Sequence, residues 1–243
     1  MSEHHIQCER EDIAPAVMLV GDPGRATRAA ALLEESRLVN DYRELLVYTG
    51  LYGGTRLTVA TTAMGAPSAA IVLEELCNLG GTVFVRVGSA GGLAPGLMSG
   101  DIVVATAAVR EDGTSACYLR PTFPAIGDPE LVAIVRASAK RVRARSVAGV
   151  VVSHDAFYRG FAMEELTRFR DAGALAQEME TGCIYIVAQV RRVRAAALFA
   201  IGGNLLLPGK QSRADFDKAE EEVVRIGLDA LAEAVRIGLV AGG

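Results

Sequence analysis

The pattern that decides the fold lies in the stretch Val17-Met18-Leu19-Val20-Gly21-Asp22-Pro23-Gly24-Arg25. Its four consecutive aliphatic residues predict a strand that is buried on both faces. Gly21 and Pro23 then turn the chain sharply, and a helix is expected from about Arg25 to Glu35. A buried strand that leads directly into a helix is the building unit of α/β sheets.

The same alternation continues along the rest of the chain. Strands or apolar runs are predicted at Leu57–Thr62, Thr82–Val87, Ile102–Ala107, Val147–Val152 and Ala195–Ile201, and helices at Ser68–Leu79, Pro129–Val142, Met163–Asp171, Met179–Val190 and Ala214–Val240. We therefore expect an α/β fold of three layers, in which a central mixed, mostly parallel sheet is flanked by helices. No linker divides residues 1–243, which are expected to form a single domain. The region Arg110–Asp128 lacks a clear period and is expected to be a surface excursion.

The composition narrows the classes of function. The 243 residues are 51% hydrophobic and carry a net charge of −4, which argues against nucleic acid as a partner. The four cysteines lie far apart, without a C-x-x-C pair or a suitably spaced His, so we expect reduced thiols and no metal site. The polar N-terminus MSEHHIQCER does not fit a signal peptide, and no apolar run approaches the roughly 20 residues that span a membrane. We therefore expect a cytoplasmic protein without a membrane partner.

The residues that follow each strand are the first candidates for a site, because ligands gather at the carboxyl ends of strands in such sheets. Gly21–Arg25 brings helix-terminal N–H groups, a helix dipole and the guanidinium of Arg25 to one point, which suits an anion. An ordinary strand-to-helix turn is the alternative. The stretch lacks the spacing and the lysine of a P-loop, so a nucleoside triphosphate is not expected.

A second candidate follows the strand Thr82–Val87. Arg86 is embedded in that apolar strand, where an unpaired charge would be costly, so an anionic group should meet it. Ser89 and its small neighbours offer hydroxyl and backbone donors with room for a ligand. An internal salt bridge with a glycine bend is the alternative interpretation.

A third candidate is the sequence Gln177-Glu178-Met179-Glu180. A carboxylate there could accept both hydrogen bonds of a vicinal diol such as the one in ribose, whereas the alternative is a helix start that attracts acids through its dipole. Phe157-Tyr158 could be core residues or a stacking wall for a planar base. His154-Asp155 is not expected to be a catalytic pair, because adjacent residues of an extended segment point to opposite sides.

Together these elements resemble the nucleoside phosphorylase family, which includes hexameric purine nucleoside phosphorylases, methylthioadenosine phosphorylases and uridine phosphorylases. The resemblance runs from His5-Ile6 to the final helix. It is carried by five pieces in order: Gly21–Arg25, Arg43 within Val39–Arg43, Met64-Gly65 with Pro67-Ser68, Arg86–Gly91, and Glu178-Met179-Glu180. Each piece alone is common, but five in this order and spacing are specific. The implied activity is phosphate-dependent cleavage of a ribonucleoside to free base and ribose 1-phosphate, with phosphate as co-substrate and no cofactor.

The resemblance also implies roles for individual residues. The implied phosphate contacts are Gly21, Arg25, Arg86, Ser89 and Arg43, the last reaching in from a neighbouring subunit. The implied ribose contacts are Glu180, Met179, Met64 and a histidine lent by the neighbour, which is His5 or His4. Phe157 matches the aromatic residue that stacks on the base. A site shared through His5 and Arg43 implies a homo-oligomer, a dimer at least and a hexamer by analogy.

The base-binding half departs from the family. Purine-specific relatives have an Asp that acts as general acid where this chain reads Ile201-Gly202-Gly203-Asn204, and neither Gly203 nor Asn204 can donate a titrating proton. The assisting arginine of those relatives has no clear match, although Lys210 and Arg213 are close in sequence. Uridine phosphorylases have Asn near this point, but their uracil-reading Gln and Arg are replaced by Phe161 and Met163.

The implied catalytic residues are Arg86, Glu180 and Asn204, and the residues implied near the base are Phe157, Phe161 and Asn204. Asn204 either assists the leaving group or shapes the loop. A nucleosidase and a non-catalytic nucleoside-binding protein remain as alternatives.

Overall fold

The computed structural model describes residues 2–143, 146–158, 162–207 and 212–240. Within them the strands are β1 (Ala16–Val20), β2 (Glu34–Asn40), β3 (Val47–Tyr52), β4 (Thr55–Thr61), β5 (Val83–Gly92), β6 (Ile102–Glu111), β7 (Ala125–Ile126), β8 (Ser146–His154), β9 (Ala176–Glu178) and β10 (Arg194–Asn204). The α-helices are α1 (Pro23–Ala30), α2 (Ala66–Asn78), α3 (Gly113–Tyr118), α4 (Pro129–Val142), α5 (Met163–Asp171), α6 (Thr181–Arg191) and α7 (Arg213–Arg236). No helix in this part of the chain is long and apolar enough to cross a membrane.

The strands form one mixed sheet in the order β10-β6-β8-β9-β5-β1-β4-β3-β2, with β7 on β6. The central strands β4, β1, β5 and β10 run parallel to one another, as expected for alternating strands and helices. An additional pairing joins β10 to β5, so β5, β10, β6, β8 and β9 pair in a closed cycle. The long strand β5 belongs to both the open sheet and this cycle, and it carries Arg86.

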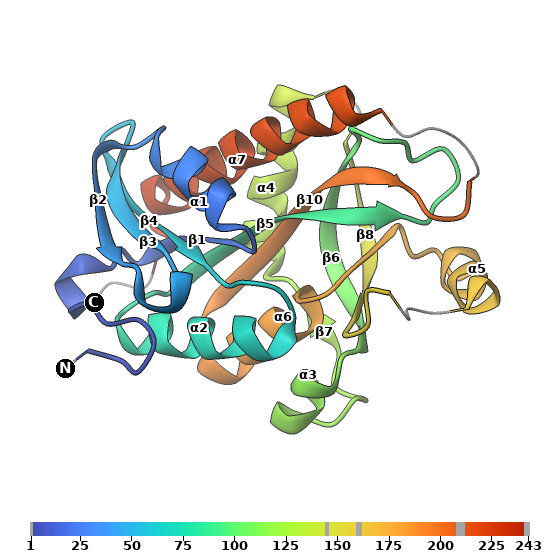
Figure 1. The fold of residues 1–243 in the computed structure, drawn as a ribbon, viewed down its shortest axis with the longest axis horizontal. Coiled ribbons are helices and arrows are strands. Elements are labelled where there is room, and N and C mark those ends of the chain that lie inside the picture. Colours follow the sequence, from blue (N-terminus) through green and yellow to red (C-terminus); the bar gives the residue numbers. More distant parts are fainter. Residues whose placement is uncertain (1, 144–145, 159–161, 208–211, 241–243) are drawn as a thin grey trace.

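Helices cover both faces of the sheet, which confirms the α/β fold with a flanked sheet (Figure 1). Alternate residues of β1 point to different clusters: Met18 and Val20 pack with α1, α4 and α7, whereas Val17 and Leu19 pack with α2 and α6. The same period in β5 sends Val85 to the α7 side and Phe84 to the α2 and α6 side. Arg86 therefore leaves the strand on the side of α2 and α6.

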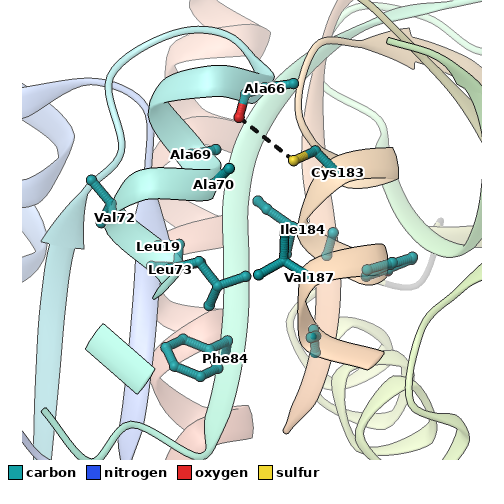
Figure 2. Packing of buried hydrophobic residues seen from close by; sticks show 14 of the residues in the cluster. Leu19, Ala66, Ala69, Ala70, Val72, Leu73, Phe84, Cys183, Ile184 and Val187 are labelled. Carbon is teal, nitrogen blue, oxygen red and sulfur yellow. Dashed lines mark hydrogen bonds between the residues drawn. The ribbon is translucent and has the colours of Figure 1, made fainter. Parts of the chain in front are cut away.

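Helices α2 and α6 pack against each other through small and aliphatic residues (Figure 2). Ala66, Ala69 and Ala70 lie close to the first turn of α6, where the Cys183 thiol donates to the Ala66 carbonyl at 3.5 Å. Small residues let the two helices approach closely, so both N-termini lie at one place. The residues just before them, Gly65 and Glu180, thereby become neighbours.

Several predicted boundaries are wrong. Strand β5 runs to Gly92 rather than Val87, and β6 runs to Glu111 rather than Ala107. The helix predicted to Glu35 ends at Ala30, because Glu34–Asn40 forms the edge strand β2 on β3. Most of β2 is exposed and lacks an apolar alternation, so pairing with β3 rather than local pattern makes it a strand. The final helix, predicted to Val240, ends at Arg236, and Gly238 follows with φ +75°.

The predicted excursion Arg110–Asp128 contains α3 and β7. The Arg110 guanidinium organises it by donating to the carbonyls of Ser115, Leu119, Arg120 and Phe123 at 2.6–2.7 Å. Asp112 and Asp155 also accept backbone N–H groups of this segment, so charged side chains hold a segment that has no sequence period of its own.

Candidate functional site

Four connections meet at one edge of the sheet, because β1, β4, β5 and β10 are parallel and end there. They are the turn Gly21–Asp22 before α1, the loop Thr62–Gly65 before α2, the end of β5 at Ser89–Gly92, and the residues after Asn204. Strand β9 pairs antiparallel with the end of β5 and brings Glu178 and Glu180 to the same edge. The edge thus collects most of the sequence-predicted residues.

Arg25 lies in the first turn of α1 and is buried, with 4% of the residue exposed. Its Nη1 donates to the Val87 carbonyl at 3.3 Å, its Nη2 pairs with Glu220 of α7, and its Nε is buried without a hydrogen-bond partner among the described residues. The backbone N–H groups at this turn are not free as the sequence suggests. The Asp22 carboxylate accepts from the N–H of Gly24 at 3.0 Å and of Arg25 at 2.8 Å, which caps the helix. The guanidinium is therefore the main cationic group that this turn offers to an anion.

Arg86 is also buried, and two carboxylates meet it. Its Nη2 donates to Glu180, and its Nε lies 3.4 Å from a Glu178 oxygen, while Nη1 has no hydrogen-bond partner within the described chain. The sequence suggested either an internal salt bridge or an anion-binding guanidinium, and the structure has features of both. Arg86 forms a salt bridge, and its Nη1 remains as a donor without a partner within the described chain. A Cβ built on Gly88 would lie 3.2 Å from Nη2, so the Arg86 guanidinium lies beside Gly88, while Arg25 binds the carbonyl of the preceding residue, Val87.

Glu180 is the N-cap residue of α6 and has 4% of its surface exposed. One of its oxygens pairs with Arg86, and the other accepts from the backbone N–H of Gly65 at 2.7 Å. Gly65 has φ +91°, a conformation that favours glycine and aims this N–H at the carboxylate. Glu180 is therefore a fixed carboxylate with two oriented oxygens, the arrangement that suits two neighbouring hydroxyl groups.

Glu178 is a fully enclosed carboxylate that holds the site together. It accepts from the backbone N–H groups of Glu180 and Thr181 and from the Ser153 hydroxyl of β8. Burial raises the pKa of Glu178, while nearby Arg86 opposes the rise. Its hydrogen bonds join β8, β9 and α6, so the second acid of the motif has a structural function at this edge.

Other predicted residues border the edge. Ser89 is exposed at the end of β5, Gly21 and Met179 are half-buried, and Met64 is 83% exposed beside Gly65. Phe157 and Tyr158 follow β8 and are 71% and 96% exposed, so they are not core residues. Phe161 and Lys210 lie outside the described residues. Arg213 pairs with Asp217 within α7 at 2.7 Å.

Asn204 is buried at the end of β10, and its amide is committed to the backbone. Its Nδ2 donates to the carbonyls of Ala94 at 2.9 Å and Leu97 at 3.1 Å, and its Oδ1 accepts from the N–H of Leu206 at 3.0 Å. This geometry favours the interpretation that Asn204 shapes the loop. The half-buried Gly202 and Gly203 before it carry no side chain that could act as an acid.

His5 and Arg43 are not brought to the edge by their own chain. The His5 ring is 2.7 Å from a Glu75 oxygen, and Glu75 lies ten residues along α2 from Gly65, which corresponds to about 15 Å of helix. Arg43 lies on an exposed turn between β2 and β3, with φ +57° and its guanidinium over Tyr42 at 5.6 Å. His4 is exposed next to His5.

A cavity of about 600 Å³ lies elsewhere, near the amino ends of β1, β5 and β10. It is lined by Arg10, Arg56 and Arg191, whose guanidinium groups bind backbone carbonyls, Glu74 and Asn78. Its lining includes none of the sequence-predicted site residues, so this cavity is separate from the candidate site. Among the described residues no three His, Cys, Asp or Glu side chains gather to hold a metal ion.

Sequence reasoning missed Glu220 and Ser153. Glu220 stands in the run Glu220-Glu221-Glu222, where composition does not distinguish the three. The spacing along the helix could have distinguished Glu220. It lies three and four residues before the buried Val223 and Val224, which places it on the inner face of the helix. Ser153 comes directly after the predicted strand Val147–Val152, but nothing in the sequence shows that it meets Glu178.

Comparison with known proteins identifies the family of this chain. The model of the phosphorylase superfamily matches residues 15–236. A guanosine phosphorylase of Halorubrum lacusprofundi is 37% identical over 235 residues, covering 97% of this chain and 95% of the relative. A uridine phosphorylase of Thermococcus kodakarensis is 34% identical over 247 residues, covering 97% and 86%. The solved structure of a Toxoplasma gondii purine nucleoside phosphorylase with immucillin-H aligns with a TM-score of 0.90 at 27% identity, over 97% of each chain.

Proposed function

The chain belongs to the phosphorylase superfamily, and on that premise we propose that it cleaves a ribonucleoside with inorganic phosphate to free base and ribose 1-phosphate. One observation carries this proposal: two buried guanidinium groups contact adjoining residues of β5, Arg25 at Val87 and Arg86 at Gly88, and Arg86 also pairs with the fixed carboxylate of Glu180. A dianionic oxyanion and a vicinal diol would both be satisfied within that arrangement.

The chemistry needs no protein nucleophile, because phosphate itself attacks the anomeric carbon. Arg25 and Arg86 would hold phosphate, with Gly21 and Ser89 at the rim of its site, and Glu180 would accept hydrogen bonds from the ribose hydroxyls. The glycosidic bond then loosens towards an oxocarbenium-like state, which the nearby carboxylate and phosphate stabilise.

The base is expected to leave as an anion. Gly203 stands where purine-specific relatives have an acid, and Asn204 has its amide engaged with the backbone. Uracil and purines with a carbonyl group can spread the negative charge into that group, whereas adenine cannot. We therefore expect uridine, inosine or guanosine to be better substrates than adenosine or methylthioadenosine. Phe157 would stack on the base; Phe161 is assigned to it by resemblance alone.

A panel of these nucleosides, with and without phosphate, tests the reaction. Phosphate-dependent release of one base, with ribose 1-phosphate as co-product, is the expected result. Release without phosphate would identify a nucleosidase instead. No release from any nucleoside by folded protein would identify a binding protein and overturn the proposal.

Glu180→Gln tests the site. Glutamine keeps the size of the side chain but removes the charge that stabilises the transition state, so kcat/KM should fall at least about 100-fold. Glu164→Gln, an exposed change on α5, is the matched control and should leave the kinetics unchanged. Normal turnover by folded Glu180→Gln would remove Glu180 from the reaction.

We also propose that the site is completed by a second copy of the chain. Glu75 holds His5 far along α2, and Arg43 sits on an exposed turn, and both observations support a contribution to a neighbour's site rather than to their own Glu180. The working unit would be a dimer at least, and a hexamer by family resemblance. Mixing inactive Arg43→Ala and Glu180→Gln proteins after dissociation should restore part of the activity. Two inactive proteins that stay inactive in verified mixed oligomers would refute the sharing.

A further inference from the structure

Glu220 lies between two arginines of α1, Arg25 in its first turn and Arg28 in its last. It pairs with Arg25, and its second oxygen is 3.9 Å from Nη2 of Arg28. The side chain of Glu220 is 17% exposed and that of Arg25 is 5% exposed, so water screens this pair only weakly. The carboxylate comes from α7, on the opposite face of the sheet from Glu178 and Glu180.

The position of Glu220 matters because Arg25 is a proposed phosphate ligand. Of the guanidinium nitrogens, Nη2 faces Glu220, Nη1 faces the Val87 carbonyl, and Nε is buried without a hydrogen-bond partner in the described chain. An oxyanion on the same guanidinium would share it with a carboxylate. Two anions on one cation repel each other strongly where water is excluded.

The carboxylates on the two arginines differ in what they can do for the reaction. Glu180 on Arg86 also reaches the Gly65 N–H and is placed to accept ribose hydroxyls. The contacts described for Glu220 are with arginines only. Glu220 lies neither on β9 nor beside the proposed ribose contacts. Its charge therefore acts on Arg25 and on whatever Arg25 binds.

Resting on the phosphate-dependent reaction proposed above, we propose that Glu220 competes with phosphate for Arg25 and thereby sets the phosphate concentration that half-saturates the enzyme. Before phosphate binds, Glu220 neutralises Arg25 and holds its guanidinium next to the Val87 carbonyl. When phosphate binds, its oxygens take over donors of Arg25 at the cost of the pairing with Glu220. The carboxylate thus weakens phosphate binding without touching the nucleoside.

The test compares Glu220→Gln with Glu222→Gln. Glutamine at 220 keeps the size and an acceptor oxygen for Arg25 but removes the competing charge. Glu222 lies two residues along the same helix and pairs with Arg143 instead. We expect the KM for phosphate to fall about three- to tenfold in Glu220→Gln, with the nucleoside KM unchanged, and no change in Glu222→Gln. An unchanged or raised phosphate KM in Glu220→Gln would overturn the inference.

Calorimetric titration with inorganic phosphate alone separates this inference from the proposed function. Tighter phosphate binding by Glu220→Gln in a protein that turns over no nucleoside would support the competition and refute the reaction. Normal nucleoside turnover, with the same phosphate affinity in Glu220→Gln and in the parent protein, would support the reaction and refute the competition. Glu220→Ala is the second variant should the glutamine protein not fold, because it removes the same charge and should also tighten phosphate binding.

Discussion

Arg86 carries a full charge inside a strand that is otherwise apolar, and its neighbours decide whether it can stay there. Glu178 and Glu180 both approach it, from one short stretch of chain between β9 and α6. Removing Arg86 would leave both buried carboxylates uncompensated, and breaking a buried ion pair in this way costs about 3–5 kcal/mol. At the residue scale, the site is thus held by the same charges that would serve catalysis.

Asn204 differs from Arg86. Its position matches the leaving-group region of the family, but its contacts indicate a structural role. Replacing it by Ala would leave the Leu97 carbonyl and the Leu206 N–H without the partner that Asn204 provides, while the Ala94 carbonyl would keep the Leu97 N–H at 3.2 Å. We expect Asn204→Ala to lower the free energy of unfolding by about 2–4 kcal/mol, since each buried polar group left unpaired costs about 1–3 kcal/mol. Urea unfolding measures the change, with Asn78→Ala on the exposed end of α2 as control. Unchanged stability together with a large loss of kcat would assign Asn204 to the leaving group instead.

At the scale of elements, α7 matters because it packs across β1, β5 and β10 and delivers Glu220 to the site edge. Its close approach depends on Gly227. A Cβ at this position would lie 2.6 Å from Cγ2 of Val87 and 2.8 Å from Cε of Met18, both fully buried. The helix therefore sits as near to the sheet as the absence of a side chain permits.

Gly227→Ala is expected to destabilise the protein by about 1–3 kcal/mol, because overpacking a filled core outweighs the better helix propensity of alanine. Glu221→Ala, an exposed change on the same helix, should have an effect within about 0.5 kcal/mol. Denaturant unfolding of both variants measures the difference. Equal stability of Gly227→Ala and the parent protein would show that α7 can move away from the sheet freely.

At the scale of the whole molecule, the N-terminal segment is tied to α2 through Glu75. This carboxylate accepts from the backbone N–H of His5 at 2.9 Å and of Ile6 at 2.7 Å, and from the His5 ring. Burial alone would raise the pKa of Glu75, but these hydrogen bonds outweigh it and hold the pKa below its usual value. The lowered pKa means that the ionised carboxylate stabilises the fold above the usual carboxyl range, and that this contribution is lost as the pH falls below about 4.

We expect slow hydrogen exchange at the His5 and Ile6 amides at pH 7 and faster exchange, relative to the intrinsic rate, below about pH 4. Glu75→Gln should show the fast exchange at both pH values and, under the proposed function, a raised nucleoside KM with an unchanged phosphate KM. Glu74→Gln, which disturbs the pair with Arg191 instead, is the control. Equal protection of His5 in Glu75→Gln and the parent would show that Glu75 does not anchor the segment.

The sequence by itself determined the elements whose pattern is local. The strand at Val17–Val20, the helices Pro129–Val142 and Met163–Asp171, and the order of the anion and diol motifs all follow from aliphatic runs, caps and turn residues. These features depend on neighbours in the chain, so they can be read without knowing the fold. Arg25 and Arg86 were found for the same reason, since Arg25 follows a predicted strand and Arg86 lies within one, and Glu180 was found at the start of a predicted helix.

Only the tertiary structure decided what each charge meets. The pairing of Glu220 with Arg25 spans 195 positions, that of Glu180 with Arg86 spans 94, and that of His5 with Glu75 spans 70. The edge strand β2 and the closed cycle through β9 likewise depend on partners that no local pattern specifies. Hydrogen bonds and ion pairs act over a few ångströms in space, whatever the distance along the chain, so the fold had to bring their partners together before the site could be described.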